Sequence, residues 1–356
     1  MLPRSLLLAI CLSLPAFAQF DTAVVLGTVH DQTGNVVPAA AIKLLNVETG
    51  IQATTTTNDT GDYLFLNVKI GTYKLTAEKV GFSAANAGNV AVSVNARQRV
   101  DFALQVGQVT ESINVTDGVI AVESDSSDRG LVVGRKQIVD LPLNGRNYAD
   151  LALLTTGVRR SDYAVANPPR EGSFNVNGQR SIFNNFLMDG MDNNAYGTSN
   201  QGFSNQVVQL TPDAVGEFKV VTANASAEFG RSSGAVINAT MRSGTNDFHG
   251  TAWEYLRNTE LNAVGFFKPA TGKPVFQRNQ FGFTAGGRIV RNRAFFFTNY
   301  EGFRERQKFT VFSTLPTVSD RAATFTVPIT NPLTGAIGNG GQRAEDGGLL
   351  ALAEPS

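Results

Sequence analysis

Few side chains in this sequence could perform covalent or metal chemistry. The 356 residues include two histidines, His30 and His249, and one cysteine, Cys11. A zinc protease site needs at least three protein ligands around one ion, and neither histidine lies in an H-E-x-x-H arrangement. Ser232 and Ser233 lack the G-x-S-x-G turn of a hydrolase nucleophile. The sequence therefore predicts no catalytic residue, no metal site and no cofactor.

Composition limits the class of function further. The 30 basic and 30 acidic residues give a formal net charge of zero, which provides no field to hold nucleic acid. The 35 glycines, with short clusters of Asn and Thr between alternating segments, favour strands and turns over helices. We expect a mainly β protein of two or three domains without a nucleic-acid partner.

The first 18 residues have the pattern of a cleaved secretory signal. Arg4 supplies one positive charge, an apolar run follows, and Ala16 and Ala18 form an A-x-A cleavage pattern. The apolar run is shorter than the about 20 residues that a membrane-spanning helix needs. A lipoprotein site at Cys11 is the competing use, but Ile10 is larger than the residue that such a site requires. We expect an exported protein.

Residues 22–106 alternate apolar and polar side chains in short runs, as in a β-sandwich. In GTYKLTAEKVGF, for example, Tyr73 and Leu75 share one face. Regularly spaced turn residues fit about seven strands in two packed sheets. The G-x-V-x-D-x-x-G-x-x-x-P opening at 27–38 and the T-x-x-x-G-x-Y-x-F-x-x-V step at 57–68 resemble the carboxypeptidase regulatory-like domain. That resemblance implies a prealbumin-like sandwich in which these residues are structural.

Residues 119–246 read as a mixed α+β domain. LPLNGRNYADLALLTTGV predicts an Asn-Gly turn and a short helix with Tyr148, Leu151 and Leu154 on one side. Thr211, followed by Pro212, predicts a second helix start before a strand. FNVNGQR and NNFLMDGMDNN suggest two more strands that each meet a tight turn.

From residue 247 to 315 the predicted strands become longer and aromatic. QFGFTAGGRI places its large apolar side chains on one face and Gln280 and Thr284 on the other, as in a transmembrane barrel strand. The connection at 259–276 is long like an extracellular loop, and the next is short like a periplasmic turn. Three or four such strands are expected before an irregular segment at 316–356, whereas plugged transporters use about 22. A soluble antiparallel sheet could alternate in the same way, but the resemblance described next favours a fold that ends in an incomplete transmembrane β-barrel.

Three stretches of the sequence resemble the plug domain of TonB-dependent outer-membrane receptors, in the Oar-like group whose chains begin with such a sandwich. In chain order they are LPLNGRNYADLALLTTGV, FNVNGQRSIFNNFLMDGMDNN and VGEFKVVTANASAEFGRSSGAVINATMRSGTNDFHG. Phe229-Gly230 stands where the family usually has Tyr-Gly. The resemblance implies a plug at 119–246, a location in the outer membrane and contact with its lipid.

The resemblance also implies a coupling segment. The inner-membrane protein TonB acts on such receptors through strand addition, which depends on extended backbone more than on particular side chains. In the linker at 107–118, ESINVT resembles this coupling box in composition and position. Its residues are Glu111, Ser112, Ile113, Asn114, Val115 and Thr116. An ordinary linker strand, or the last strand of the sandwich, is the alternative interpretation.

Apical plug loops of such receptors face the extracellular ligand, which directs attention to MDNNAYGTSNQGFSN. The candidate ligand-facing residues are Asp192, Asn193, Asn194 and Tyr196. The alternative is a polar loop without a binding role. No residue here distinguishes a siderophore, cobalamin, a glycan or a peptide as the ligand.

Uptake of a ligand across the outer membrane is therefore the first functional hypothesis. The second is a secreted or periplasmic module that binds carbohydrate or protein through the sandwich and performs no transport. The second hypothesis predicts a soluble product, and the first predicts one that fractionates with the outer membrane.

Overall fold

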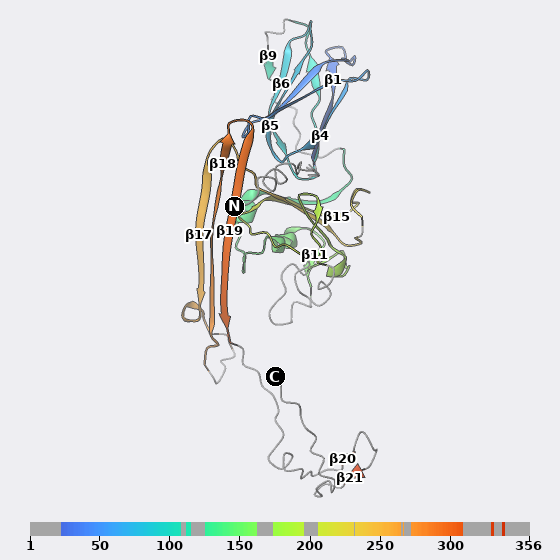
Figure 1. Ribbon diagram of the computed structural model, residues 1–356. Coiled ribbons are helices and arrows are strands. Elements are labelled where there is room, and N and C mark those ends of the chain that lie inside the picture. The colour runs from blue at the N-terminus through green and yellow to red at the C-terminus, as the bar shows by residue number, and fades with distance from the viewer. Residues whose placement is uncertain are drawn as a thin grey trace, which may run out of the picture. The chain divides into compact units, whose positions relative to one another are not determined.

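The structure is a computed structural model whose chain divides into two compact units, residues 1–255 with 280–303 and residues 256–279 with 304–356. The predicted signal segment lies outside the described residues. The structure describes residues 23–107, 125–161, 174–195, 206–230, 232–264, 266 and 272–308, and the backbone of 112–114, 329–330 and 337–338. Within these residues the chain is mainly β, as predicted (Figure 1).

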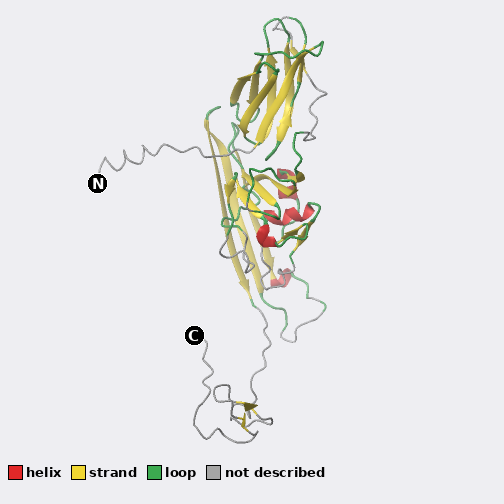
Figure 2. Cartoon of the chain, turned by 90° about the vertical axis from the view of Figure 1, so that its right-hand side faces the viewer, coloured by secondary structure: helices red, strands yellow, loops and turns green. Residues whose placement is uncertain are grey.

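The N-terminal domain, here called the sandwich, has two sheets, which Figure 2 shows as two layers. One sheet contains β4 (Asp62–Val68), β1 (Ala23–Asp31), β7 (Arg97–Arg99) and β8 (Phe102–Leu104). The other has the order β3 (Gln52–Thr56), β2 (Ala41–Asn46), β5 (Gly71–Glu78), β6 (Ala84–Val92) and β9 (Ser112–Asn114). The prediction of a prealbumin-like sandwich agrees with these two sheets.

Alternation of side chains explains how the two sheets pack. Along β1 every second residue is buried, and the core includes Phe65, Tyr73 and Leu75. Tyr63 is also in this core, and its hydroxyl donates a hydrogen bond of 2.6 Å to the carbonyl oxygen of Val100. The aromatic residues of the family motif therefore serve the core.

The middle domain, defined here as residues 125–241, is built on a second sheet. Its order is β10 (Arg129–Val133), β15 (Val215–Ala223), β16 (Val236–Met241), β13 (Asn185–Met188) and β14 (Met191–Asp192). Beside it lie the pair β11 (Val158–Arg160) and β12 (Phe174–Val176), and the short helices α2 (Arg135–Asp140), η1 (Tyr148–Leu154) and η3 (Ser181–Phe183). Phe186, Phe218 and Ile237 are fully buried in its core.

One local prediction for the middle domain is confirmed in part and another is wrong. The predicted short helix is present as η1, a 3₁₀ helix in which Tyr148 and Leu151 are buried, whereas Leu154 at its last position is 51% exposed. Thr211 starts a single turn, closed by the hydrogen bond from Val215 N to Thr211 O, and β15 begins at once. Helix start signals at Thr211 and Pro212 were followed by residues that pair as a strand, so no helix propagated.

The third element is a three-stranded antiparallel sheet, here called the wall sheet. It consists of β17 (His249–Asn258), β18 (Phe276–Val290) and β19 (Ala294–Gln307), in that order (Figure 1). Gln280 and Thr284 are buried, whereas Phe283 and Ile289 on the opposite face are exposed. This division matches the predicted lumen-facing and lipid-facing sides of a barrel strand.

The second compact unit contains the far ends of the wall strands. There η5 (Thr259–Leu261) follows β17, and Phe276 N donates to Thr259 Oγ1 at 2.7 Å. Arg278 on β18 pairs with Glu305 on β19 at 2.6 Å. The short pair β20 (Ile329–Thr330) and β21 (Ile337–Gly338) also belongs to this unit. Among the helices of the described residues, none is both long and apolar enough to cross a membrane.

Candidate functional site

A left-handed turn between α2 and η1 positions the principal candidate residue, Arg146. Gly145 and Arg146 have φ angles of 92° and 57°, a conformation that suits glycine and costs other residues about 1–2 kcal/mol. Asn147 then caps η1, because its side-chain oxygen accepts a hydrogen bond of 3.2 Å from Ala149 N. The sequence Asn-Gly-Arg-Asn thus encodes a turn of fixed shape.

Tyr148 anchors this turn in the core of the middle domain. Its ring is 1% exposed and meets Phe218 edge to face, with ring centroids 5.3 Å apart. Its hydroxyl donates a 2.6 Å hydrogen bond to Gln206 Oε1, a buried residue. The backbone at the neighbouring Arg146 is therefore held in place, and the Arg146 side chain extends outward from this fixed position.

The Arg146 side chain reaches from the middle domain to the wall sheet. It forms an ion pair with Asp213 of the middle domain, and its Nε lies 3.1 Å from Glu301 Oε2 on β19. The guanidinium also lies over two rings of β17, 5.0 Å from the centre of Trp253 and 4.6 Å from that of Tyr255. We call these five residues the wall cluster.

Burial makes the charges of the wall cluster interdependent. The side chains of Arg146, Asp213 and Glu301 are only 8%, 13% and 11% exposed. Burial by itself would lower the pKa of Arg146, but the hydrogen bonds and charges of the two carboxylates outweigh it and raise that pKa above its ordinary value. Arg146 is therefore a permanent cation. Without it the buried Glu301 would lose its cation, and Asp213 would keep Arg135, whose Nη2 lies 3.4 Å from Asp213 Oδ1.

The same region makes two neutral contacts with the wall sheet. Gln280 on β18 donates from Nε2 to the Gly145 carbonyl oxygen at 3.1 Å. Thr211 donates from Oγ1 to Asn299 Oδ1 on β19 at 3.2 Å. Together with the wall cluster, these contacts connect one edge of the middle domain to β17, β18 and β19.

Sequence reasoning did not single out Arg146, Asp213 or Glu301 as site residues. The available signals were local: an arginine directly after an Asn-Gly turn, and a lone carboxylate in the aromatic segment of β19. Neither signal shows that the two residues meet, since 155 positions separate them. The wall cluster is thus a product of the tertiary structure.

The predicted ligand-facing residues lie at the base of their loop. Asn193 is buried and holds Val208 with two hydrogen bonds, 2.8 Å to its carbonyl oxygen and 2.9 Å from its amide. Asn194 accepts from Phe186 N at 2.9 Å, and Asp192 is exposed. Tyr196 lies outside the described residues. The asparagines shape the base of the loop, and the ligand-facing role stays a prediction.

The predicted coupling residues are described in part. Ser112, Ile113 and Asn114 form β9, which pairs in parallel with Ala84, Ala85 and Asn86 at the edge of the sandwich. Glu111, Val115 and Thr116 lie outside the described residues. Ser112–Asn114 therefore have the extended backbone that strand addition requires, and the coupling role of residues 111–116 stays a prediction.

The described residues contain no group of three or more His, Cys, Asp or Glu side chains that could hold a metal ion. The wall cluster likewise offers two carboxylates and a guanidinium but no nucleophile beside them. Its chemistry is that of a polar contact between two elements, one that can be broken and remade.

Three family models match successive parts of the chain. The Carboxypeptidase regulatory-like domain matches residues 24–105, and the TonB-dependent Receptor Plug Domain matches residues 123–237. The Outer membrane beta barrel domain matches residues 240–347. The order of the three matches is the order of the sandwich, the middle domain and the wall sheet.

Individual proteins are similar to the chain as well. The TonB-dependent transporter Oar of Myxococcus xanthus is 27% identical over 301 residues, which are 80% of this chain and 27% of that protein. Two solved structures are similar at lower levels. The outer membrane transporter YddB from Escherichia coli is 17% identical with a TM-score of 0.38, and the match covers 45% of this chain and 24% of that one. The siderophore receptor PirA from Acinetobacter baumannii is 19% identical with a TM-score of 0.36, and the match covers 48% of this chain and 24% of that one. The chain thus spans about a quarter of the length of these proteins.

Proposed function

Since this chain belongs to the TonB-dependent outer-membrane receptors, we propose that it carries the plug of a receptor that takes up an extracellular ligand. In this proposal the middle domain is the plug, and the wall sheet is part of the surrounding barrel in the outer-membrane lipid. The sandwich precedes both on the periplasmic side. The assignment is to a receptor and transporter, not to an enzyme.

The wall cluster is the observation that supports this proposal most directly. A plug must stay bound to the barrel wall at rest and must move away from that wall during uptake. Separating an apolar interface exposes apolar surface to water at a cost in free energy, whereas the charges of a buried ion pair regain hydration when the two surfaces part, which offsets part of the lost attraction. Arg146 between Asp213 and Glu301 provides such a contact between plug and wall.

The partner on the periplasmic side is proposed to be TonB, acting on residues 111–116. The parallel pairing of Ser112–Asn114 with β6 supports this choice, because it involves only three residues at a sheet edge. A ladder this short contributes little stability by itself, and a partner strand could replace it. The extracellular ligand is proposed to meet the loop that follows Asp192, Asn193 and Asn194 and includes Tyr196; its chemical class stays open.

A backbone-directed pair of variants tests the coupling assignment. Ile113→Pro removes a backbone N–H and restricts the chain, whereas Ile113→Ala shortens the same side chain and keeps the backbone. We expect the purified protein to lose binding to the C-terminal domain of TonB in I113P and to retain it in I113A, measured by calorimetry or surface plasmon resonance. Equal binding by both variants, or loss in both, would refute strand addition at this segment.

A further inference from the structure

The sandwich contacts the middle domain through a turn and through an ion pair, in which Arg99 Nε lies 2.8 Å from Asp125 Oδ2. The residues Ser93–Ala96 connect β6 to β7 and are here called the tip. Val94 is fully buried and Ala96 is 4% exposed, yet neither belongs to the core cluster of the sandwich. Asn95 adopts a left-handed conformation with φ of 54°, which asparagine tolerates better than most residues. The tip is therefore buried apart from the main core of the sandwich.

Three polar side chains on the outer face of β15 and β16 receive the tip. Glu217 accepts a hydrogen bond from Val94 N, Lys219 donates to the Asn95 carbonyl oxygen at 3.2 Å, and Asn238 donates to Asn95 Oδ1 at 2.8 Å. We call Glu217, Lys219 and Asn238 the socket. Lys219 is 4% exposed and Asn238 is 1% exposed. Strand alternation directs their neighbours Phe218 and Ile237 into the core, so without the tip the socket would face water.

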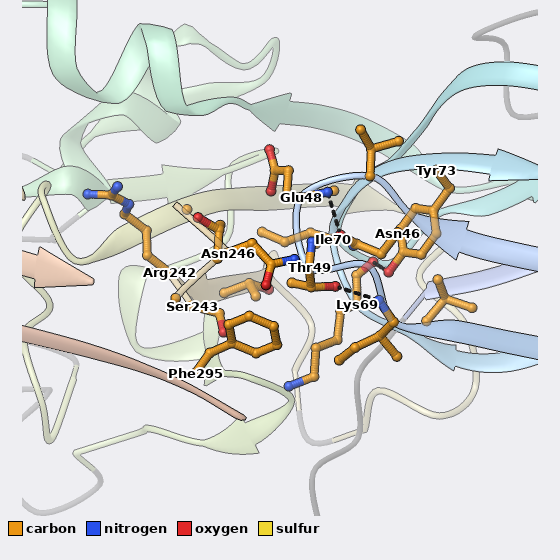
Figure 3. A pocket seen from close by; sticks show the side chains of 18 of the residues that line it. Asn46, Glu48, Thr49, Lys69, Ile70, Tyr73, Arg242, Ser243, Asn246 and Phe295 are labelled. Atoms are coloured by element: carbon orange, nitrogen blue, oxygen red, sulfur yellow. Dashed lines mark hydrogen bonds between the residues drawn. The ribbon is translucent and has the colours of Figure 1, made fainter. Parts of the chain in front are cut away.

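The surroundings of the socket indicate a separable contact. Beside it lies a cleft of about 1190 Å³ lined by residues of the sandwich, the middle domain and the wall sheet, among them Thr49, Gly216 and Phe295 (Figure 3). The sandwich also makes a polar contact with the segment between β16 and β17, since Asn246 N donates to the Glu48 carbonyl oxygen at 3.1 Å. Interfaces between domains that are small, polar and discontinuous allow relative motion.

We propose that the sandwich is a reversible, proton-controlled cap on the middle domain, in which the tip docks into the socket when Glu217 is protonated and leaves it when Glu217 is ionised. The inference concerns the two domains alone and holds whether or not the protein transports a ligand. If the protein transports a ligand, displacement of the plug requires either that the sandwich undocks first or that it moves together with the plug.

The physical reason for proton control is the position of Glu217. Burial raises the pKa of Glu217 from its ordinary 4.5 to about 7, and the hydrogen bond from Val94 N opposes this shift. No residue of the tip is titratable. The other titratable and charged groups around Glu217 and the cleft are Lys219, Asp128, Arg135, Arg242, Lys69, Glu48, Asp189, Asp247, His249 and Arg291.

The sign of the effect follows from linkage. The pKa of Glu217 is higher in the docked state than in the undocked state, where water surrounds the carboxyl group. Docking is therefore strongest below pH 4.5 and weakens as the pH rises through 7. Between pH 5.5 and 8.5 these two pKa values, 4.5 and about 7, correspond to a loss of about thirtyfold in the docking equilibrium constant.

Alkylation of a cysteine at the tip measures undocking. The sequence has one cysteine, Cys11, inside the predicted signal, so Val94→Cys provides a single reporter in the exported chain. Iodoacetamide would label V94C only while the tip is out of the socket. Dividing the rate in V94C by the rate in V94C/E217Q at the same pH removes the pH dependence of thiol chemistry, because a glutamine does not titrate.

We expect this ratio of rates to rise about thirtyfold between pH 5.5 and 8.5, in line with the linkage estimate. Asn238→Leu should accelerate labelling at both pH values, and Lys43→Ala, on the sandwich surface outside the interface, should change nothing. Ala96→Cys repeats the measurement if V94C fails to fold, as judged by circular dichroism. A ratio that is constant with pH would overturn proton control, and labelling as fast as in urea would overturn docking itself.

Discussion

Replacing Arg146 with methionine tests whether the wall cluster holds the middle domain against the wall sheet. The variant keeps a long unbranched side chain but leaves Glu301 buried without its cation and leaves Asp213 with Arg135, 3.4 Å away, as its remaining partner. Removing one partner of a buried ion pair costs about 3–5 kcal/mol, because the remaining charge is neither hydrated nor paired. Since the Arg146 side chain is 8% exposed, we expect R146M to lose stability within this range.

The assay can be local to the cluster. The chain has one tryptophan, Trp253, whose ring lies under the Arg146 guanidinium, so its fluorescence reports on this site during urea unfolding of the purified protein. The free energy of unfolding is then compared by linear extrapolation. The matched control is Arg160→Met, because Arg160 is 57% exposed and only 3.7 Å from Asp150. That exposed pair should contribute at most about 1 kcal/mol.

A double-mutant cycle separates the ion pair from general damage. If Arg146 and Glu301 interact as the structure shows, R146M/E301Q should be less destabilised than the sum of the two single variants, with a coupling energy of about 0.5–3 kcal/mol. The reasoning is refuted if R146M costs no more than R160M, or if the two single effects simply add. Either result would mean that the wall cluster contributes no specific stability.

Two further variants probe the scaffold around these contacts. Tyr148→Phe removes the buried hydrogen bond to Gln206, so we expect thermal unfolding to show a loss of about 1–3 kcal/mol with unchanged secondary structure. Gly130→Ala would place a Cβ 2.0 Å from the Val220 carbonyl oxygen and force β10 away from β15, so we expect it to cost about 1–3 kcal/mol of stability. The control is Gly134→Ala, whose Cβ would meet nothing within 4 Å and which should cost less than about 1 kcal/mol in the same measurement.

The two polar contacts suggest complementary mechanical roles. Arg146 connects the middle domain to the wall sheet through a cation that stays charged at any physiological pH. Glu217 connects the middle domain to the sandwich through a carboxyl group that titrates near neutrality. On the proposals above, the first contact would respond to displacement of the plug, and the second would respond to the proton concentration of the medium.

Much of the architecture could be predicted from short stretches of the sequence. Alternation placed Tyr73 and Leu75 in the sandwich core and put Gln280 and Thr284 on the buried face of β18. Such predictions succeed because strand geometry directs successive side chains to opposite faces, so the local order of residues carries the information. Local signals were misleading at Thr211, where a helix start was overruled by strand pairing.

The tertiary structure alone decided which polar residues meet. Arg146 is 67 positions from Asp213 and 155 from Glu301, and Lys219 is 124 positions from Asn95. No periodicity encodes these pairs, because a charged side chain on a strand or turn has the same local pattern whether it faces water or another domain. Burial by a distant segment changes that environment, and this change gives Arg146 and Glu217 their distinct chemistry.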